Sequence, residues 1–382
     1  MVIGIDASRA VTSQHTGTEA YAWFLIRALI ALTAVQNHTL RLYFNQPPPP
    51  NLFLAADHVE RVVMPFPRLW THLRLAYELH RRPPDLFFTP AHVIPLTYRG
   101  PSAATVHDLG YHYFPEAHPR RQLAYLRWST RHNGRRAHHI LADSQATKDD
   151  LVRLDGLSPD KISVVYPGLD ATLQPVGDTE RITAVLHRYG ITPPYLLFIS
   201  TLQPRKNLIR LIRAYKAANL PHQLVLAGKP GWLNQPIMEE IANGQRSIAN
   251  GQWPNPQSAI LLPGFIADAD KAALLSGAAA FLYPSLYEGF GFPLLEAQAC
   301  GVPVLAANSS SLPEIAGNAA LLVDPLDEAA LAAALRRIVE DQSLRQELIA
   351  GGLANVQRFT WEETAVRTLH ILQSIPDSVN HR

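Results

Sequence analysis

The sequence contains little that would crosslink the chain or anchor it in a bilayer. Among 382 residues there is one cysteine, Cys300, so no internal disulfide can form, and we expect a buried structural thiol in a reducing compartment. No uncharged apolar run approaches the roughly 20 residues that a membrane-spanning helix needs. Residues 1–6 also lack the basic and long apolar segments of a signal peptide. Together these absences predict a cytoplasmic protein.

The charge balance excludes a further class of partner. Lys and Arg number 34 and Asp and Glu number 32, which leaves a formal charge of +2. Tracking a nucleic-acid backbone needs a dense basic surface, and the sequence contains no tract of that density. We therefore expect a small ligand and no nucleic-acid partner. Hydrophobic residues make up 47% of a chain longer than one core usually supports, so two domains are expected.

Short apolar runs separated by helical patterns recur in two series. The first series occupies residues 2–5, 40–44, 86–88, 103–106, 139–142 and 162–165. The second occupies residues 195–200, 223–227, 259–262, 279–283, 302–306 and 320–323. Alternating strands and helices predict an α/β protein with two Rossmann-like, doubly wound domains, 1–177 and 178–360. Because such sheets bind ligands beyond the carboxyl ends of their strands, chemistry is expected in the loops that follow these runs.

The segment Glu288-Gly-Phe-Gly-Phe-Pro-Leu-Leu-Glu296 follows one of these strands and leads into a helix. A helix N-terminus offers unpaired N–H groups and a partial positive charge, so a glycine-lined turn before it can hold a diphosphate. Gly289 and Gly291 allow close approach to the main chain. Each carboxylate suits two neighbouring hydroxyls of a ribose or a hexose. The alternative is that Glu296 complements the helix dipole and Glu288 is a solvated turn residue, but the whole segment favours a nucleotide-sugar site.

Two cations follow the first strand of the second half, in the segment Thr201-Leu-Gln-Pro-Arg-Lys-Asn207. Arg205 and Lys206 are therefore expected at the same sheet edge as Glu288. Breaking the bond between a sugar and a nucleotide builds negative charge on the β-phosphate, and fixed cations stabilise that charge. The alternative, a solvated basic helix start, is unattractive because cations oppose the helix dipole at that end.

His107 and Asp108 end a strand of the first half, which predicts that His107 lies at the ligand-binding edge of that sheet. The imidazole could hydrogen-bond a sugar hydroxyl or the reacting centre. Asp108 could fix its tautomer or cap the next turn. A purely structural histidine is the alternative, since the chain has 16 of them.

Glycines after other strands predict further points of close approach. Gly17 follows the first strand of the chain, while Gly228 and the Gly264-Phe265 pair follow strands of the second half. A glycine permits phosphate or acceptor to approach the backbone, and main-chain groups near Gly228 and Phe265 could frame a base. The alternative is that Gly228 and the Gly264-Phe265 pair simply form turns.

The segment from Glu288 to Glu296 resembles the E-x7-E signature of retaining glycosyltransferases of the family 4 type, which have the two-domain GT-B fold. The P-R-K-N segment that contains Arg205 and Lys206, the H-D segment at His107 and the Gly17 loop are similar to segments of the same family. Many relatives have Gly-Arg where this chain has Ser200-Thr201, a departure that leaves one phosphate contact unassigned. Residues 361–382 resemble the last helix of GT-B proteins, which returns from the second domain to brace the first.

The resemblance implies transfer of a hexose of the mannose or glucose type from a nucleoside diphosphate sugar to a hydroxyl acceptor, a glycan or a lipid-linked glycan. It implies retention of anomeric configuration, no cofactor and no bound metal. The departing phosphate would take the acceptor's proton, so no dedicated base is expected. His107, Arg205, Lys206 and Glu288 would take part in catalysis. The donor-binding residues that it implies are Gly17, Arg205, Lys206, Gly228, Phe265, Glu288, Gly289, Phe290, Gly291 and Glu296.

Two other activities stay open at this point. One is a nucleotide-sugar epimerase of the same fold, which would release free diphosphate. The other is a non-catalytic subunit that binds a nucleotide sugar as a sensor or scaffold. Intact cations and both glutamates argue against the second, and the pairing of P-R-K-N with E-x7-E argues against the first.

Two further features have competing interpretations. Asp268-Ala-Asp270 matches the metal-binding D-x-D of the other major glycosyltransferase fold, but it precedes a helical run and favours an N-cap with an acidic first turn. Residues 119–136 are basic and aromatic, which favours a long surface helix with one packed face. Peripheral contact with anionic lipid at the inner face of the membrane is the alternative for this run. Ser144 is predicted to cap the next helix.

Overall fold

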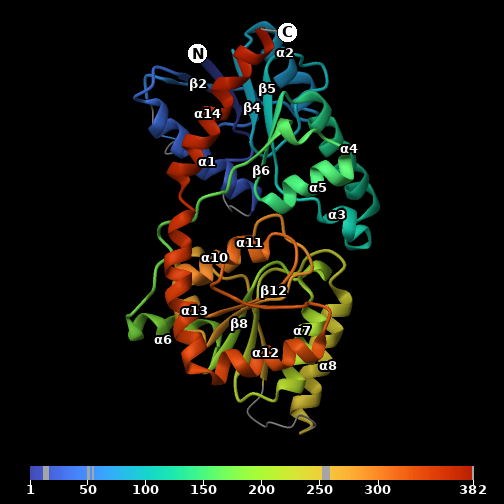
Figure 1. Ribbon diagram of the computed structural model, residues 1–382, viewed down its shortest axis with the longest axis vertical. Coiled ribbons are helices and arrows are strands. Elements are labelled where there is room, and N and C mark those ends of the chain that lie inside the picture. Colours follow the sequence, from blue (N-terminus) through green and yellow to red (C-terminus); the bar gives the residue numbers. More distant parts are fainter. Residues whose placement is uncertain (12–16, 50–51, 54–55, 252–258, 381–382) are drawn as a thin grey trace. The chain divides into compact units, whose positions relative to one another are not determined.

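The structure, a computed structural model, describes residues 1–11, 17–49, 52–53, 56–251 and 259–380. The chain divides into two compact units (Figure 1). The first comprises Met1–Leu109, Arg121–Gly168 and Phe359–Arg382, and the second comprises Gly110–Arg120 and Leu169–Arg358. Each unit contains one parallel sheet with helices packed against it, which confirms the predicted α/β class with two doubly wound domains.

The sheet of the first unit has seven strands in the order β3-β2-β1-β4-β5-β6-β7. The strands are β1 (Val2–Asp6), β2 (Thr39–Phe44), β3 (Val59–Val63), β4 (Leu86–Thr89), β5 (Ser102–Val106), β6 (His139–Ala142) and β7 (Ile162–Val164). Neighbouring strands all pair in parallel, and the central ones are buried, as their unbroken apolar runs predict. Strand β3 was not predicted. It is a half-buried edge strand in which Glu60 and Arg61 interrupt the apolar residues.

Helices of the first unit include the segment that closes the chain. They are α1 (Thr18–Thr33), the π-helical turn η1 (Thr71–Leu75), α2 (Ala76–Arg81), α4 (Arg120–Arg136), α5 (Gln145–Asp155) and α14 (Trp361–Asn380), with a 3-10 turn η3 (Pro159–Lys161) before β7. Helix α14 packs beside α1, and in Figure 1 the red helix lies next to the blue one. Trp361 stacks on Phe24 with ring centroids 5.3 Å apart, and Thr364 Oγ1 donates to the Tyr166 carbonyl over 2.8 Å. The last helix of the described chain thus belongs to the first unit.

Local caps set several helix boundaries. Ser144 Oγ accepts a hydrogen bond from the Thr147 amide at 3.1 Å, so the predicted cap of α5 is confirmed. Gly156 ends the same helix in the left-handed conformation. Helix α4 buries Thr130, Asn133 and Gly134 on one face, as expected of a surface helix. In the part of the chain that the structure describes, no helix combines the length and the apolar character that crossing a membrane requires.

The sheet of the second unit has six strands in the order β10-β9-β8-β11-β12-β13, again all parallel. They are β8 (Tyr195–Ile199), β9 (Gln223–Ala227), β10 (Ala259–Gly264), β11 (Ala280–Tyr283), β12 (Val304–Ala307) and β13 (Leu321–Val323). The α-helices of this unit are α3 (Gly110–Tyr113), α6 (Thr179–Tyr189), α7 (Leu208–Ala218), α8 (Gln235–Ala249), α9 (Asp268–Ser276), α10 (Phe292–Ala299), α11 (Leu312–Ala316), α12 (Glu328–Glu340) and α13 (Gln342–Asn355). Short 3-10 turns are η2 (Pro115–Ala117), η4 (Pro204–Lys206) and η5 (Val356–Arg358). The six predicted apolar runs of this half therefore all form strands.

Each sheet has one point at which the strand order reverses. In the first sheet β1 is flanked by β2 on one side and by β4 on the other, and in the second sheet β8 is flanked by β9 and β11. Loops that leave two such neighbouring strands turn toward opposite faces, which opens a crevice at the carboxyl edge. These two switch points are where ligand chemistry is expected.

The units differ from the predicted domains 1–177, 178–360 and 361–382 in one respect that changes the site. Residues 110–120 belong to the second unit, although they directly follow a strand of the first. The Trp232 indole N–H donates to the Ala117 carbonyl, and the rings of Tyr113 and Tyr287 stack 5.0 Å apart. Nothing in the local sequence indicates that residues 110–120 pack with the second unit rather than with the first. The main boundary falls at Gly168, before the predicted domain end at residue 177.

Candidate active site

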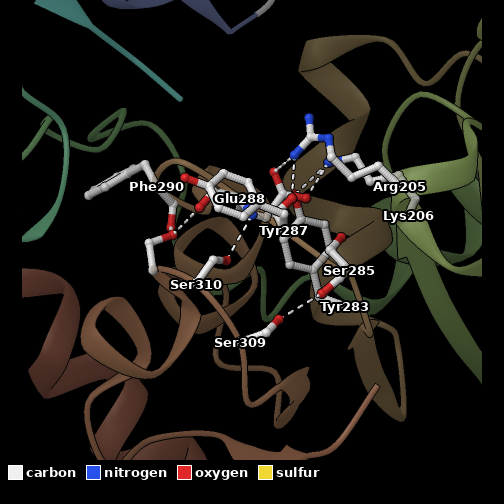
Figure 2. Close-up of polar contacts among 10 residues, drawn as sticks. Arg205, Lys206, Tyr283, Ser285, Tyr287, Glu288, Phe290, Ser309 and Ser310 are labelled. Atoms are coloured by element: carbon white, nitrogen blue, oxygen red, sulfur yellow. Dashed lines mark hydrogen bonds and ion pairs between the residues drawn. The ribbon is translucent and has the colours of Figure 1, made fainter. Parts of the chain in front are cut away.

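Three charged side chains meet at the switch point of the second sheet. Arg205 and Lys206 lie in η4 after β8, and Glu288 lies in the loop after β11. Glu288 Oε2 is 2.9 Å from Arg205 Nη1, and its Oε1 is 2.6 Å from Lys206 Nζ. Figure 2 shows the carboxylate pointing toward both cations. The structure thus brings together the three residues that the sequence placed at one sheet edge.

This cluster is buried. Glu288 is 7% exposed and Lys206 is 5% exposed. Lys206 Nζ also donates to Tyr283 Oη over 3.0 Å and lies 5.0 Å from the centre of that ring. Arg205 donates to the Tyr287 carbonyl as well as to Glu288. Charges held this far from water interact strongly, and their side chains have little freedom to move.

Burial alone would raise the pKa of Glu288, but Arg205 and Lys206 outweigh it and lower the pKa to about 2. The carboxylate is therefore ionised at neutral pH. Two cations and one anion leave the cluster with a net charge of +1, which attracts an anionic ligand while keeping both cations in place.

Polar groups on neighbouring loops fix the main chain around Glu288. The Glu288 amide donates to Ser310 Oγ over 2.8 Å, and Ser311 Oγ donates to the carbonyls of Glu288 and Phe290. Both serines lie between β12 and α11. In Figure 2, Ser310 approaches the Glu288 backbone from the side opposite the cations. These serines were not predicted as site residues. The only feature of the sequence that could have indicated them is their position directly after a strand.

Asn207 fixes η4 in the same way. It adopts the left-handed conformation with φ of 60°, and its amide donates to the carbonyls of Pro284 and Pro325 over 3.2 and 2.6 Å. The side chain thereby ties the loop after β8 to the loop after β11. It is the last residue of the P-R-K-N segment, and only the structure shows that it is a positioning residue.

Glu296 lies in α10, which Gly291 precedes with a φ of 122°. Its carboxylate is 3.1 Å from Lys271 Nζ in α9. Burial alone would lower the pKa of Lys271, but Glu296 raises it above its ordinary value, so the lysine is charged. Lys271 was not among the predicted site residues, because the sequence gave no sign that α9 and α10 approach here.

The aromatic and glycine residues of the predicted donor site differ in exposure. Phe290 is buried and contacts the Phe292 ring edge to face, so its main chain rather than its ring is available to a ligand. Gly289 lies between Glu288 and Phe290 in the same loop. Phe265 is 47% exposed, and Lys229 Nζ lies 4.5 Å from its ring centre.

Gly228 and Gly17 are glycines for different reasons. Gly228 has a φ of 142°, and a Cβ built on it would lie 1.9 Å from the Ser200 carbonyl oxygen. Gly17 has a φ of 49° at the start of α1, and a Cβ there would meet nothing within 4 Å. Gly228 is therefore required by close packing between two loops, whereas at Gly17 the described residues leave room for a side chain.

His107 lies in the first unit after β5, and both of its ring nitrogens have partners. Nδ1 is 2.7 Å from Asp143 Oδ2, and Nε2 is 2.8 Å from the Pro90 carbonyl oxygen. Burial alone would lower the pKa of His107, but the Asp143 carboxylate offsets this and the pKa is raised. Of the two roles offered for Asp108, fixing the tautomer falls instead to Asp143, which directly follows β6 and hydrogen-bonds the ring. Tyr21 packs edge to face against it with centroids 4.8 Å apart.

The N-cap expected at Asp268-Ala-Asp270 is corrected by the structure. Ala267 occupies the cap position of α9, and both aspartates lie in the first helical turn. Both Asp270 carboxylate oxygens accept hydrogen bonds from Arg188 Nη1, at 2.7 and 2.6 Å. This carboxylate therefore holds a helix against its neighbour.

Family models match both halves of the chain. Residues 187–353 match the model described as "Glycosyl transferases group 1", and residues 15–173 match "Glycosyltransferase Family 4". The two models thus cover most of both doubly wound domains.

Relatives of known function are mannosyltransferases and other glycosyltransferases. O-antigen chain mannosyltransferase B of Escherichia coli is 32% identical over 274 residues, which cover 70% of this chain and 69% of that protein. The serotype-specific mannosyltransferase WbdA of Escherichia coli is 30% identical over 237 residues. That match covers 60% of this chain but only 28% of WbdA, so the chain spans under a third of this longer relative.

Solved structures share the fold. Sucrose-phosphate synthase from Thermosynechococcus elongatus has a TM-score of 0.74 and 20% identity, with 99% of each chain covered. Anabaena HepE, solved with UDP and glucose, has a TM-score of 0.70 and 20% identity, with 98% of this chain and 99% of HepE covered. Both sheets, the matched models and these relatives agree, and the chain belongs to the glycosyltransferases of the family 4 type with the GT-B fold.

Proposed function

We propose that this protein transfers a hexose of the mannose or glucose type from a nucleoside diphosphate sugar to a hydroxyl acceptor, a glycan or a lipid-linked glycan, with retention. The observation that supports this most directly is the buried cluster of Arg205, Lys206 and Glu288 at the switch point of the second sheet. A net positive cluster at a sheet edge suits the diphosphate of such a donor. Relatives that are mannosyltransferases support a mannose-type donor.

In this proposal the cations act on the leaving group. The bond between the anomeric carbon and the β-phosphate oxygen breaks, and Arg205 and Lys206 stabilise the charge that develops on that oxygen. The acceptor oxygen forms the new bond on the same face, and the departing phosphate takes its proton. No step requires a metal ion or a dedicated base. His107, whose two ring nitrogens are held by Asp143 and the Pro90 carbonyl in the first unit, has a positioning role for the loop that follows β5.

Glu288 has two roles in this scheme. It holds the cations in place before the donor binds, and it is the proposed partner of the donor hexose. The diphosphate must therefore share Arg205 and Lys206 with this carboxylate. Glu296, supported by Lys271, is the proposed ribose-binding residue, and the main chain near Gly228 and Phe265 would frame the base.

The test combines binding with product analysis. Thermal unfolding is followed with GDP, UDP and ADP sugars, because a ligand at 100 times its dissociation constant adds about 2.7 kcal/mol of stability. The stabilising donor is then incubated with hydroxyl acceptors, with and without EDTA. We expect a product whose anomeric configuration by NMR matches the donor, at a rate that EDTA leaves unchanged. An inverted product contradicts retention, and loss of activity in EDTA contradicts the metal-free mechanism.

The alternatives predict other products. An epimerase would release free diphosphate and an altered sugar without acceptor. A non-catalytic subunit would be stabilised by the nucleotide sugar but would neither transfer nor hydrolyse the hexose. Either result would replace the proposed transfer.

We propose in addition that the first unit contacts an anionic membrane surface through α4 and the segment before α2. Helix α4 carries seven Arg or His side chains and no acidic residue, and Tyr125 and Trp128 on it are exposed. The His72 ring packs edge to face on Trp128 with centroids 5.8 Å apart, which places η1 beside α4. Leu69 and Leu73, near this contact, are 66% and 52% exposed. Exposed apolar and cationic side chains side by side fit a lipid headgroup region.

Vesicle co-sedimentation tests this surface. The protein should pellet with phosphatidylglycerol vesicles and less with phosphatidylcholine vesicles. Leu69→Ser combined with Leu73→Ser should reduce pelleting several-fold, whereas Val35→Ser, at an even more exposed apolar position, should not. Equal pelleting by all three proteins would leave α4 as an ordinary surface helix.

A further inference from the structure

A short stretch of chain, Gly110–Arg120, belongs to the second unit although both of its neighbours in the sequence belong to the first. We call it the crossing segment. The chain leaves the first unit after Leu109 and returns to it at Arg121. Ordering such a detour costs conformational entropy, which contacts within the second unit must offset. Those contacts lie at the two ends of the segment, and both lead to Arg205.

The start of the crossing segment packs against Arg205 and the loop after β11. The rings of Tyr113 and Tyr287 stack with an angle of 28° between their planes and centroids 5.0 Å apart. A Cβ built on Gly110 would lie 3.0 Å from Tyr287 Cδ1 and 3.4 Å from Arg205 Cδ. Gly110 therefore lets the main chain lie directly against both side chains. Tyr287 is 4% exposed, so its ring is enclosed by these contacts.

The end of the crossing segment is held by the loop after β9. The Trp232 indole N–H donates to the Ala117 carbonyl, and the His118 ring lies with its centroid 5.7 Å from that of Trp232. The Leu202 amide, in the loop after β8, donates to the Lys229 carbonyl over 2.9 Å and joins these two loops. In the sheet, β8 lies between β9 and β11. The crossing segment thus connects the loops on either side of the one that carries Arg205.

Arg205 depends on the same loop that Tyr113 contacts. Its Nη1 donates to the Tyr287 carbonyl and, over 2.9 Å, to Glu288 Oε2. The Leu286 amide donates to the Arg205 carbonyl over 2.9 Å, so the main chain of Arg205 is bound to this loop as well. Figure 2 shows the guanidinium directed toward Glu288. A shift of the Tyr287 main chain would therefore displace the guanidinium.

We propose that Tyr113 is a positioning residue for Arg205 and acts through Tyr287. The inference rests on the proposed transferase function, in which Arg205 stabilises the leaving diphosphate. The stack on Tyr113 holds the Tyr287 ring, and with it the carbonyl that accepts from Arg205. Because small displacements of a group that stabilises the transition state are costly, loss of this support should appear in the rate.

The first test needs no ligand and uses the full chain. Phenylglyoxal modifies accessible arginines, and mass spectrometry reports the labelling rate at each site. The Arg205 side chain is 14% exposed, whereas that of Arg213 is 53% exposed and provides an internal control. Tyr113→Ala should raise the labelling rate of Arg205 several-fold and leave that of Arg213 unchanged. Tyr113→Phe, which keeps the stacked ring, should label as the wild type does.

A second variant loosens the crossing segment at its other end. Trp232→Phe removes the hydrogen bond to Ala117 and leaves the Tyr113 ring in place, so any change at Arg205 cannot come from uncovering it. We expect labelling of Arg205 to rise by about twofold, the lower end of what a stacked pair is worth. Unchanged Arg205 labelling in both variants, with native thermal unfolding, would overturn the proposal.

A double-mutant cycle in the transfer assay tests whether Tyr113 acts through Arg205. Tyr113→Ala should lower kcat by about tenfold, the upper end of what a stacked pair is worth, and Tyr113→Phe should restore most of the rate. Tyr77→Ala, a 61% exposed tyrosine of α2, should retain full activity. In an Arg205→Lys protein, which lacks the planar guanidinium, Tyr113→Ala should cause no further loss. Additive losses would overturn the proposal, because Tyr113 would then act independently of Arg205.

The two tests separate this inference from the proposed function. Normal turnover by Tyr113→Ala, with unchanged Arg205 labelling, overturns the positioning role and leaves the transferase intact. Faster Arg205 labelling in Tyr113→Ala, with no nucleotide-sugar turnover by the wild type, supports the hold on Arg205 and overturns the proposed function instead.

Discussion

The two sheets of this protein share one winding pattern and differ in the chemistry at their switch points. Beyond β8 and β11, two cations and a carboxylate are buried as an ion cluster. Beyond β1 and β4, one arginine, a histidine and amide groups line a polar pocket. Since the topology is the same, the loops alone decide which ligand each edge suits. The edge beyond β8 and β11, called the charged edge below, is where we propose that the diphosphate binds.

The difference extends to how each site is held before a ligand arrives. At the charged edge, Glu288 and Tyr283 already occupy hydrogen-bond positions of Lys206, and Asn207 locks the turn. Beyond β1 and β4, Asn45 Oδ1 and Asp6 Oδ2 are buried without a hydrogen-bond partner among the residues that the structure describes. Buried charges require permanent partners because desolvation is expensive, so the charged edge is the more completely paired of the two.

The largest expected effect comes from removing a cation at the charged edge. Lys206→Ala should reduce kcat by about 10²- to 10³-fold, because a fixed charge at the leaving oxygen is lost. Lys216→Ala, an exposed lysine of α7, is the matched control and should retain full activity. Steady-state kinetics with the identified donor provide the measurement. Undiminished turnover in a folded Lys206→Ala protein would remove this lysine from the mechanism.

Low pH should lower the free energy of unfolding because Glu288 becomes protonated. Its folded pKa of about 2 lies below the ordinary value of 4.5, so the ionised form stabilises the fold above about pH 4.5 and this stability is lost as pH falls toward 2. The full effect is about 3 kcal/mol. Urea unfolding at several pH values should show a steeper loss for the wild type than for Glu288→Gln. Parallel losses would mean that the ion cluster adds no net stability.

Replacing a glycine by alanine at each sheet edge measures how much room the loops leave for a side chain there. Gly228→Ala should lower the free energy of unfolding by about 3 kcal/mol, because its Cβ would lie 1.9 Å from a backbone oxygen. Gly17→Ala should cost about 1 kcal/mol, since only its positive φ opposes the change. Urea unfolding measures both. Equal costs would show that the loop beneath Gly228 shifts to accept a side chain.

A smaller effect than the loss of Lys206 is expected in α10, where Lys271 forms an ion pair with Glu296. Glu296→Ala should weaken nucleoside diphosphate binding by about tenfold through loss of hydrogen bonds to the ribose. Lys271→Met, which removes only the partner of Glu296, should weaken it less. Calorimetry with the donor's nucleoside diphosphate measures both constants. Unchanged affinity in Glu296→Ala would refute the ribose role.

Much of this architecture was predictable because buried parallel strands leave continuous apolar runs. All twelve predicted runs form strands, and Arg205, Lys206 and Glu288 meet where the edge rule placed them. The edge strand β3 was missed because exposure removes the requirement for unbroken apolar residues. The exchange of residues 110–120 between units was missed because packing partners such as Trp232 are over 100 residues away in sequence.

By itself, the sequence determined the fold class, the two winding series, and the charged residues that follow β8 and β11. These follow from local patterning and from the rule that strand ends share an edge. Only the tertiary structure decided the partners. Asp143 rather than Asp108 holds His107, Lys271 pairs with Glu296, and residues from four segments line the polar pocket beyond β1 and β4. Partner choice depends on distances of a few ångströms between loops that are distant in sequence, and no local pattern encodes those distances.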